Sequence, residues 1–191
     1  MISNFRTYIL YIIPILFLAG CQKPVSELSS SFSCNSPVEL SGFEKVDDFK
    51  NNFRIQVPKH WNTKLYYDKI QSEIFTADTI KHLSDSYIIN YSAVSGNIDI
   101  NDELKGKVHQ KSMDNAMETL KESFHSYKGN DAFAHLSVGS SRGLKLHVFQ
   151  YYIKLSEEQY ILVKTELYGE ENFDSRFCES LSIIEKMTFI K

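Results

Sequence analysis

The sequence predicts an α+β domain in which a largely antiparallel β-sheet is covered by a long central helix and a C-terminal helix. Segments with alternating apolar and polar residues occur before residue 95 and again after residue 131, and this period of two is typical of strands. Between them, and again near the C-terminal end, apolar residues recur every three to five positions, as in helices with one buried side. An antiparallel sheet with helices packed on it buries both apolar stripes.

The first twenty residues are typical of an export signal. Tyr8–Gly20 is an apolar run of 13 residues, whereas a membrane-spanning helix needs about 20, and Arg6 supplies the positive charge before it. Leu18–Cys21 resembles the lipobox of bacterial lipoproteins, which are cleaved before a lipid-modified cysteine. The resemblance implies that residues 1–20 form a signal peptide and that Cys21 carries diacylglycerol and an acyl chain such as palmitate. The alternatives are an ordinary signal peptide with a chance cysteine, or an uncleaved anchor. Gln22 takes the place of the aspartate that retains such proteins at the inner membrane, which favours the outer membrane.

Residues 21–42 are predicted to be a lipidated tether, because the stretch after Cys21 holds seven serines, two prolines and few large apolar residues. Residues 43–191 are predicted to form a single domain. Cleavage removes one basic residue and no acidic one, so the formal net charge changes from −3 to −4 and nucleic-acid binding is not expected. Cys34 and Cys178 either form one disulfide, as an exported protein allows, or remain two unpaired small apolar residues.

Four strands are predicted in the first half of the domain. Phe53–Pro58 alternates apolar and polar residues and ends at a proline, which cannot donate to a sheet ladder. Lys64–Asp68 and Ser72–Ala77 are short segments rich in strand-forming residues. Ser86–Val94 is more apolar throughout and is predicted to be central.

The long helix is predicted from Asn101, a suitable N-cap, to Gly129, a suitable end. Its buried stripe is predicted to contain Leu104, Val108, Met113, Met117, Leu120 and Phe124.

A second group of strands is predicted at Ala132–Val138, Leu144–Leu155 and Tyr160–Leu167, joined by short turns as an antiparallel meander. The terminal helix follows, with Asn172 or Asp174 as its cap. Its apolar stripe contains Phe173, Phe177, Leu181 and Ile184.

This element order, together with the F-x-I-x-V-P-x-x-W segment at Phe53–Trp61, resembles the PsbP-like α/β/α sandwich. The superfamily includes photosystem II extrinsic proteins, a nuclear-transport GTPase-binding protein and bacterial envelope lipoproteins. The resemblance covers residues 43–191 and implies a non-catalytic accessory or binding role. It transfers no functional residue to this chain.

No motif of an enzyme is present. Ser137–Ser141 is not a G-x-S-x-G elbow, Glu157 and Glu158 are adjacent rather than spaced as an acid–base pair, and no glycine-rich phosphate loop occurs. His109, Met113 and Met117 at intervals of four could bind copper on one helix face, but the methionines are better explained as part of the buried stripe. No catalysis, cofactor or metal is therefore expected.

Trp61, Tyr66, Tyr91 and Tyr152 are the candidate binding surface, because tyrosine and tryptophan suit amphipathic docking; ordinary strand packing is the alternative. The sequence thus predicts a lipid-anchored protein of the bacterial cell envelope that binds an envelope protein partner. A carrier of a small apolar ligand is the alternative function, and it requires an apolar pocket under the helices.

Overall fold

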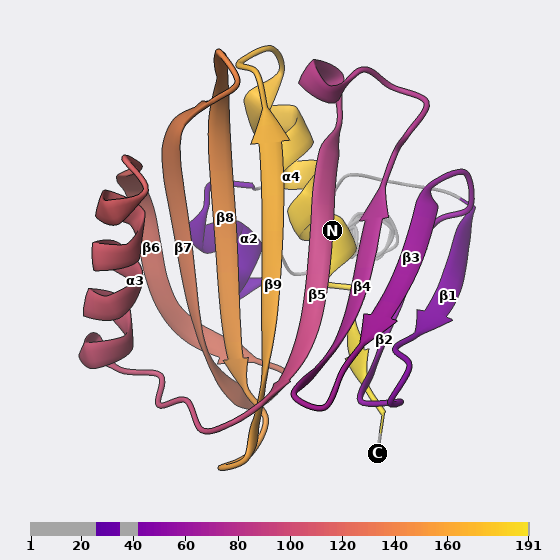
Figure 1. The fold of residues 1–191 in the computed structure, drawn as a ribbon, viewed down its shortest axis with the longest axis vertical. Helices are drawn as coiled ribbons and strands as arrows, with labels where there is room; N and C mark the ends of the chain where they lie inside the picture. Colours follow the sequence, from indigo (N-terminus) through magenta and orange to yellow (C-terminus); the bar gives the residue numbers. More distant parts are fainter. Residues whose placement is uncertain (1–25, 35–41, 191) are drawn as a thin grey trace, which may run out of the picture.

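The computed structural model describes residues 26–34 and 42–190, which form two antiparallel sheets and three α-helices (Figure 1). The seven-stranded sheet has the order β3-β4-β5-β9-β8-β7-β6 and the three-stranded sheet the order β1-β2-β10. The predicted α+β class with a largely antiparallel sheet is confirmed. The helices are α2 (Glu27–Ser31), α3 (Asp102–Asp114) and α4 (Phe173–Ile184), with a short 3-10 helix at Leu83–Asp85. The strands are β1 (Phe43–Asp47), β2 (Phe53–Pro58), β3 (Asn62–Tyr67), β4 (Gln71–Ala77), β5 (Tyr87–Ser95), β6 (Glu118–Tyr127), β7 (Asn130–Ser141), β8 (Leu144–Lys154), β9 (Gln159–Tyr168) and β10 (Thr188–Phe189).

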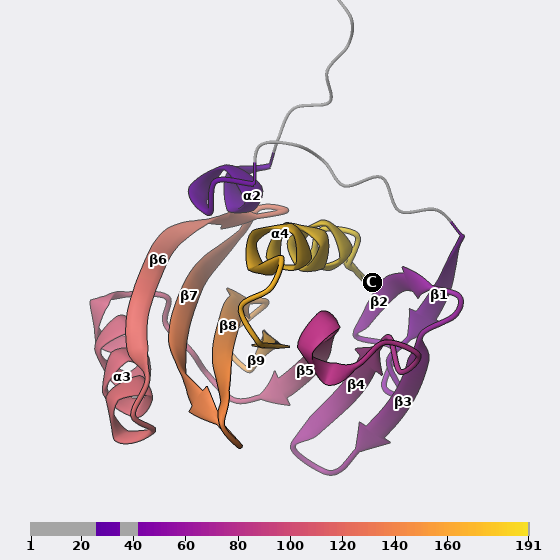
Figure 2. The ribbon, with the colours of Figure 1, turned by 90° about the horizontal axis from the view of Figure 1, so that it is seen from above.

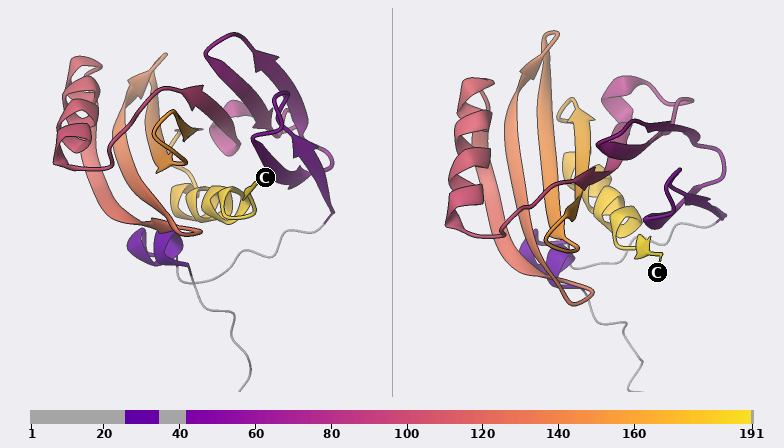
Figure 3. Two further views of the ribbon diagram at one scale, coloured as in Figure 1. Left: turned by 90° about the horizontal axis from the view of Figure 1, so that it is seen from below. Right: turned by 60° about the horizontal axis from the view of Figure 1, so that its bottom comes forward.

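The two faces of the seven-stranded sheet have different surroundings. On one, the inner face, lie α4, α2 and the three-stranded sheet (Figure 2). On the other, the outer face, α3 lies beside β6 and leaves β4, β5 and β9 without a helix over them (Figure 3). The main core fills the inner side, where Tyr91, Tyr151 and Phe149 of the sheet are fully buried together with Leu181 of α4 and Ile55 of β2.

The long helix is shorter than the sequence predicts. It starts at Asp102 with the Asn101 cap as expected, since the Asn101 side chain accepts from two backbone N–H groups at 3.1 Å. It ends at Asp114, fifteen residues before the predicted end at Gly129. The Met117 N–H donates to the Ser112 carbonyl at 2.9 Å and the Ala116 N–H to the Met113 carbonyl at 2.9 Å, the pattern of a Schellman motif.

The left-handed residue of this motif is Ala116, with a φ of 55°. Glycine usually occupies this position, so alanine here gives no sign in the sequence that the helix ends. Met117 lies just after this turn, and Leu120 and Phe124 lie on strand β6, so the predicted helical stripe is wrong beyond Val108. Met113 lies in α3, but its side chain is 59% exposed and is not part of the core. The His109, Met113 and Met117 side chains therefore do not share one helix face.

The remaining strands and the terminal helix agree with the sequence. Alternating side chains of β2 and β4 are buried, and β5 lies inside the sheet between β4 and β9. The helix α4 begins after Asn172, which has a left-handed backbone and makes no side-chain cap. The sequence does not indicate β1 or the two-residue β10, which are both held by pairing with β2.

Arg176 fixes the start of α4 against the sheet. It is 6% exposed, and its guanidinium donates to four backbone carbonyls at 2.8–3.2 Å. These carbonyls belong to Ser86, Tyr168, Gly169 and Glu171. Burial lowers the pKa of Arg176, although Asp85 and Glu171 oppose the shift, so the carbonyl oxygens take the place of water around the cation.

Part of the predicted tether is packed on the domain. Leu28 and Phe32 are buried, and the Phe32 ring makes edge contacts with Phe149 at 5.3 Å and Phe177 at 5.8 Å. Cys34 forms a disulfide with Cys178 of α4, with a Cα–Cα distance of 5.3 Å. The described part of the folded domain therefore begins at residue 26 rather than at residue 43.

Candidate functional site

The outer face is the candidate functional site, and strand register defines its three central rows. Paired residues of neighbouring antiparallel strands point to the same side of a sheet. The rows, each running from β4 to β7, are Glu73, Ser92, Leu162, Tyr152 and Phe133; Phe75, Asn90, Lys164, Gln150 and His135; and Ala77, Ile88, Glu166, Val148 and Ser137.

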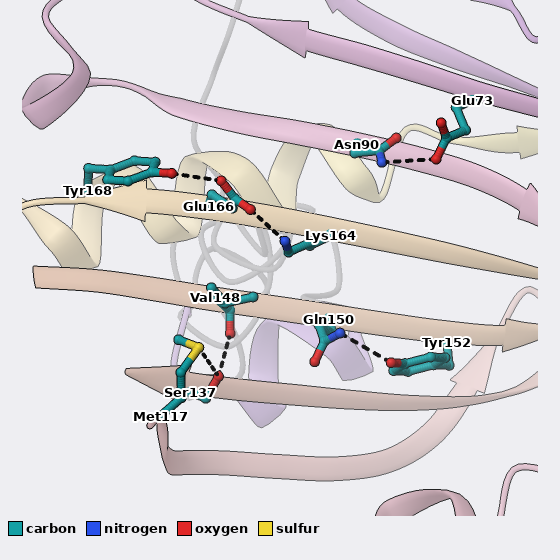
Figure 4. A network of polar contacts seen from close by, with 10 residues as sticks. All are labelled: Glu73, Asn90, Met117, Ser137, Val148, Gln150, Tyr152, Lys164, Glu166 and Tyr168. Atoms are coloured by element: carbon teal, nitrogen blue, oxygen red, sulfur yellow. Dashed lines mark hydrogen bonds and ion pairs between the residues drawn. The ribbon is translucent and has the colours of Figure 1, made fainter. Parts of the chain in front are cut away.

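Polar side chains on this face are joined in pairs across and along the strands (Figure 4). The Glu73 carboxylate accepts from the Asn90 amide at 3.3 Å and from the Ser92 hydroxyl at 3.0 Å. The Lys164 ammonium donates to Glu166 at 2.5 Å, and the Tyr168 hydroxyl donates to the other oxygen of Glu166 at 2.9 Å. The face thus presents fixed hydrogen-bonding groups rather than freely rotating side chains.

The ionisation of these groups follows from their half-buried setting. Burial disfavours the charged form of Glu166, but the hydrogen bonds from Lys164 and Tyr168 outweigh it and hold the pKa of Glu166 below its usual range. Burial and the bond to Glu166 raise the pKa of Tyr168. Lys164 and Glu166 therefore form an ion pair at neutral pH whose side chains are 41% and 26% exposed.

The helix α3 covers the β6–β7 end of the outer face. Leu104 and Val108 pack on Phe133 and Tyr152, and burial raises the pKa of the Tyr152 hydroxyl to about 12, with a smaller contribution from Tyr160. The Gln150 amide donates to the Tyr152 hydroxyl at 3.2 Å. The uncovered region of the outer face is therefore the part formed by β3, β4, β5 and β9.

Apolar side chains border the paired polar groups in this uncovered region. Tyr66 and Phe75 contact each other edge to face at 5.5 Å and are 49% and 36% exposed. Ile88 and Val94 of β5 are partly exposed beside them. A mixture of exposed aromatic and aliphatic groups with satisfied polar groups is typical of protein-binding surfaces.

The structure does not bring the four predicted surface residues together. Trp61 is 7% exposed and packs edge to face on Tyr87 at 5.1 Å, and Tyr91 is fully buried on the inner face. The prediction is therefore wrong for these two, because Trp61 lies in the bend before β3 and Tyr91 at an inward position of β5, and both side chains pack in the core. Tyr66 is exposed on the outer face, and Tyr152 lies on the same face but is 8% exposed. Residues 1–20 and Cys21, the predicted signal peptide and lipidation site, lie outside the described residues.

The described residues form no cluster of side chains suited to a metal ion. Within residues 26–34 and 42–190, no group of three or more His, Cys, Asp and Glu side chains could hold a metal ion. None of the helices in this described part is both long and apolar enough to cross a membrane.

Two hollows lie beside the start of α3, and neither is an apolar pocket between helix and sheet. The first, of about 320 Å³, is lined largely by polar residues of the 97–107 segment, including Asn97, Asp99 and Glu103. The second, of about 330 Å³, lies between this segment and the β6–β7 hairpin and includes Asp102 and Asp131. Their lining gives no specific fit to a small apolar ligand.

Solved structures with the same fold were found, although no protein-family model and no curated protein matches the chain. CyanoP, the cyanobacterial PsbP of Synechocystis, superposes with a TM-score of 0.54 and 11% identity over 81% of this chain and 96% of its own. The Ran-binding protein Mog1p of Saccharomyces cerevisiae has a TM-score of 0.53 and 10% identity over 77% of this chain and 95% of its own. A protein of Bacteroides thetaiotaomicron has a TM-score of 0.54 and 10% identity over 80% of this chain and 50% of its own. The chain therefore has the PsbP/Mog1-like fold, and at these identities the likeness concerns the fold alone.

Proposed function

We propose that the chain is a lipid-anchored, non-catalytic accessory protein of the bacterial cell envelope, and that it binds another protein through the uncovered outer face. The observation that carries this proposal is the uncovered region of β3, β4, β5 and β9, where paired polar groups lie among exposed apolar side chains. The lipobox resemblance at Leu18–Cys21 supports the anchor, and Gln22 favours the outer membrane.

A protein fits this face better than other classes of partner. In the uncovered region, Glu73 and Glu166 balance Lys64 and Lys164, so it has no excess of positive charge for the phosphates of nucleic acids or anionic lipids. A small ligand needs a hollow that encloses it, whereas these side chains lie on an open sheet. The Ran-binding activity in the description of Mog1p supports a protein-binding role for the same fold by analogy only.

The test is quantitative capture from the protein's own envelope after cross-linking in cells. Phe75→Ser and Lys164→Glu alter the outer face, and Lys59→Glu is the matched control because Lys59 is exposed at the end of β2, outside the three rows. We expect specific envelope proteins to be enriched with the natural chain and the control and lost with both face variants, while all variants keep the same thermal unfolding midpoint. Equal capture by every variant refutes the outer face as the binding surface, and no specific capture refutes the binding function.

The anchor has a separate test. Cys21→Ser is expected to move the protein from the membrane fraction to the soluble fraction, because a lipid-modified cysteine supplies the acyl chains that hold it. A Cys21→Ser protein that remains in the membrane fraction and keeps its N-terminal segment contradicts lipidation at this residue.

A further inference from the structure

The point at which the chain enters the folded domain is fixed at Ser26. The Ser26 hydroxyl accepts from the Ser29 N–H at 3.0 Å and donates to the Glu185 carboxylate at the end of α4, which also accepts from the Ser29 hydroxyl at 2.6 Å. Burial of Leu28 and Phe32 and the disulfide of Cys34 hold the rest of this segment on the inner side of the sheet.

The chain between the proposed anchor and this point is short compared with the domain. The five residues from Gln22 to Ser26 carry the chain from Cys21 to this point and span at most about 18 Å when fully extended. A tether that ended at Phe43, as the sequence predicts, would reach about 75 Å. A folded domain of about 150 residues is roughly 38 Å across on average, and along its shortest axis a helix layer packed on a sheet is still about 20 Å thick. The available chain is therefore shorter than the distance from one side of the domain to the other.

We propose that the α2 side of the domain lies against the membrane surface and that the outer face points away from it. The helix α2 lies on the same side of the sheet as α4, opposite the uncovered outer face (Figure 2). If the outer face touched the lipid, Ser26 would be farther from the membrane than five residues can reach. This inference rests on the proposed lipidation of Cys21, and it adds the orientation in which a partner meets the protein.

The charges around α2 are compatible with a lipid headgroup surface. Lys121 and Lys128 are exposed on β6 and the turn after it, close to α2 and to the end of α4. The two carboxylates next to α2 are bonded within the protein, since Glu27 accepts from the Ser126 N–H at 3.2 Å and Glu185 accepts from the two serines. Lys121 donates to the Ser33 hydroxyl at 3.4 Å and Lys128 to the Met187 carbonyl, and the other N–H groups of these exposed ammonium groups can contact headgroup phosphates.

The orientation can be tested with a photo-cross-linking amino acid in the full-length, acylated protein. The protein is reconstituted in vesicles of phosphatidylethanolamine and phosphatidylglycerol, with the probe at Ser30 or Lys128 on the α2 side, or at Tyr66 or Phe75 on the outer face. All four side chains are exposed. We expect lipid adducts to be several-fold more abundant from the first pair than from the second.

A long-tether variant is the matched control. Insertion of about twenty Gly and Ser residues between Gln22 and Lys23 raises the extended reach to about 85 Å, so the difference between the two pairs of positions should disappear. Equal lipid adducts at all four positions in the acylated natural chain overturn the orientation but leave the anchor intact. An intact mass without acyl groups on Cys21 overturns the anchor and the orientation together.

Discussion

Replacing Cys34 and Cys178 by serine is expected to lower the free energy of unfolding by up to about 5 kcal/mol. The disulfide joins residues 144 positions apart, and a cross-link of this span removes about that much conformational entropy from the unfolded chain at 25 °C. For a urea m value of about 2 kcal/mol per molar, the unfolding midpoint falls by about 2.5 M. Fluorescence of the single tryptophan, Trp61, which is 7% exposed in the core, reports the transition.

The same variant is expected to release α2. Burial of Leu28 and Phe32 contributes about 3–6 kcal/mol. Five side-chain hydrogen bonds between this segment and the domain add about 5 kcal/mol. Ordering the nine residues 26–34 costs about 9–18 kcal/mol, so without the covalent link the balance favours detachment. Any stability that detachment restores reduces the total loss below 5 kcal/mol.

Two measurements decide this prediction. Hydrogen exchange should show protection of the Phe32 and Cys34 amides, which donate within the segment at 3.2 and 2.8 Å, in the natural chain and loss of that protection in the double variant. Alkylation after unfolding without reductant should leave Cys34 and Cys178 of the natural chain unmodified. Equal urea midpoints for the two proteins, or full alkylation of the natural chain, would refute the reasoning.

Three further predictions concern stability. Arg176→Met should cost about 3–5 kcal/mol in urea unfolding because four buried carbonyls lose a charged donor; a much smaller loss would mean that water replaces the guanidinium. Ala116→Gly should raise stability by about 0.5–1 kcal/mol, because glycine adopts the left-handed conformation without strain, and an unchanged midpoint contradicts this. Burial lowers the pKa of His125, His135 and His147 in the folded state, so protonation of these side chains favours the unfolded state. The thermal unfolding midpoint should therefore fall as the pH drops below about 6.5, the pKa of an unperturbed histidine. A midpoint that stays constant between about pH 7.5 and 5 would argue against buried neutral histidines.

The alternation of apolar and polar residues in the sequence predicts most strands of this fold, because it corresponds to the alternation of buried and exposed side chains in the structure. Phe53–Pro58 and Gln71–Ala77 each bury every second side chain, as their sequences indicate. The segment Glu118–Tyr127 is different, because it lies at the edge of the sheet and leaves Leu120 and Phe124 exposed. Its strand structure depends on pairing with β7 and on the turn at Ala116, and neither is visible in a helical spacing of apolar residues.

The candidate site could not be predicted for a related reason. Glu73 and Ser92 share a row with Leu162 only because β5 pairs with both β4 and β9 in a particular register. Sequence alone identifies the aromatic residues but not the direction in which each side chain points, so it groups Trp61 and Tyr91 with Tyr66 although they belong to the core. Long-range register decides which side chains can meet a partner.

The main core lies on the inner side of the sheet and a smaller buried cluster lies under α3, which leaves the uncovered region of the outer face outside both apolar clusters. Apolar burial against α4 and the small sheet involves one face only, so the half-buried pair of Lys164 and Glu166 on the other face is not needed to form the core. An exposed ion pair contributes roughly 0–1 kcal/mol, which is too little to explain its place at the centre of a sheet by folding alone. The helix α2 lies on the opposite side of the sheet (Figure 2), so in the proposed orientation the short stretch from Cys21 to Ser26 holds α2 toward the lipid and directs the paired polar groups toward the aqueous side, where a protein partner would approach.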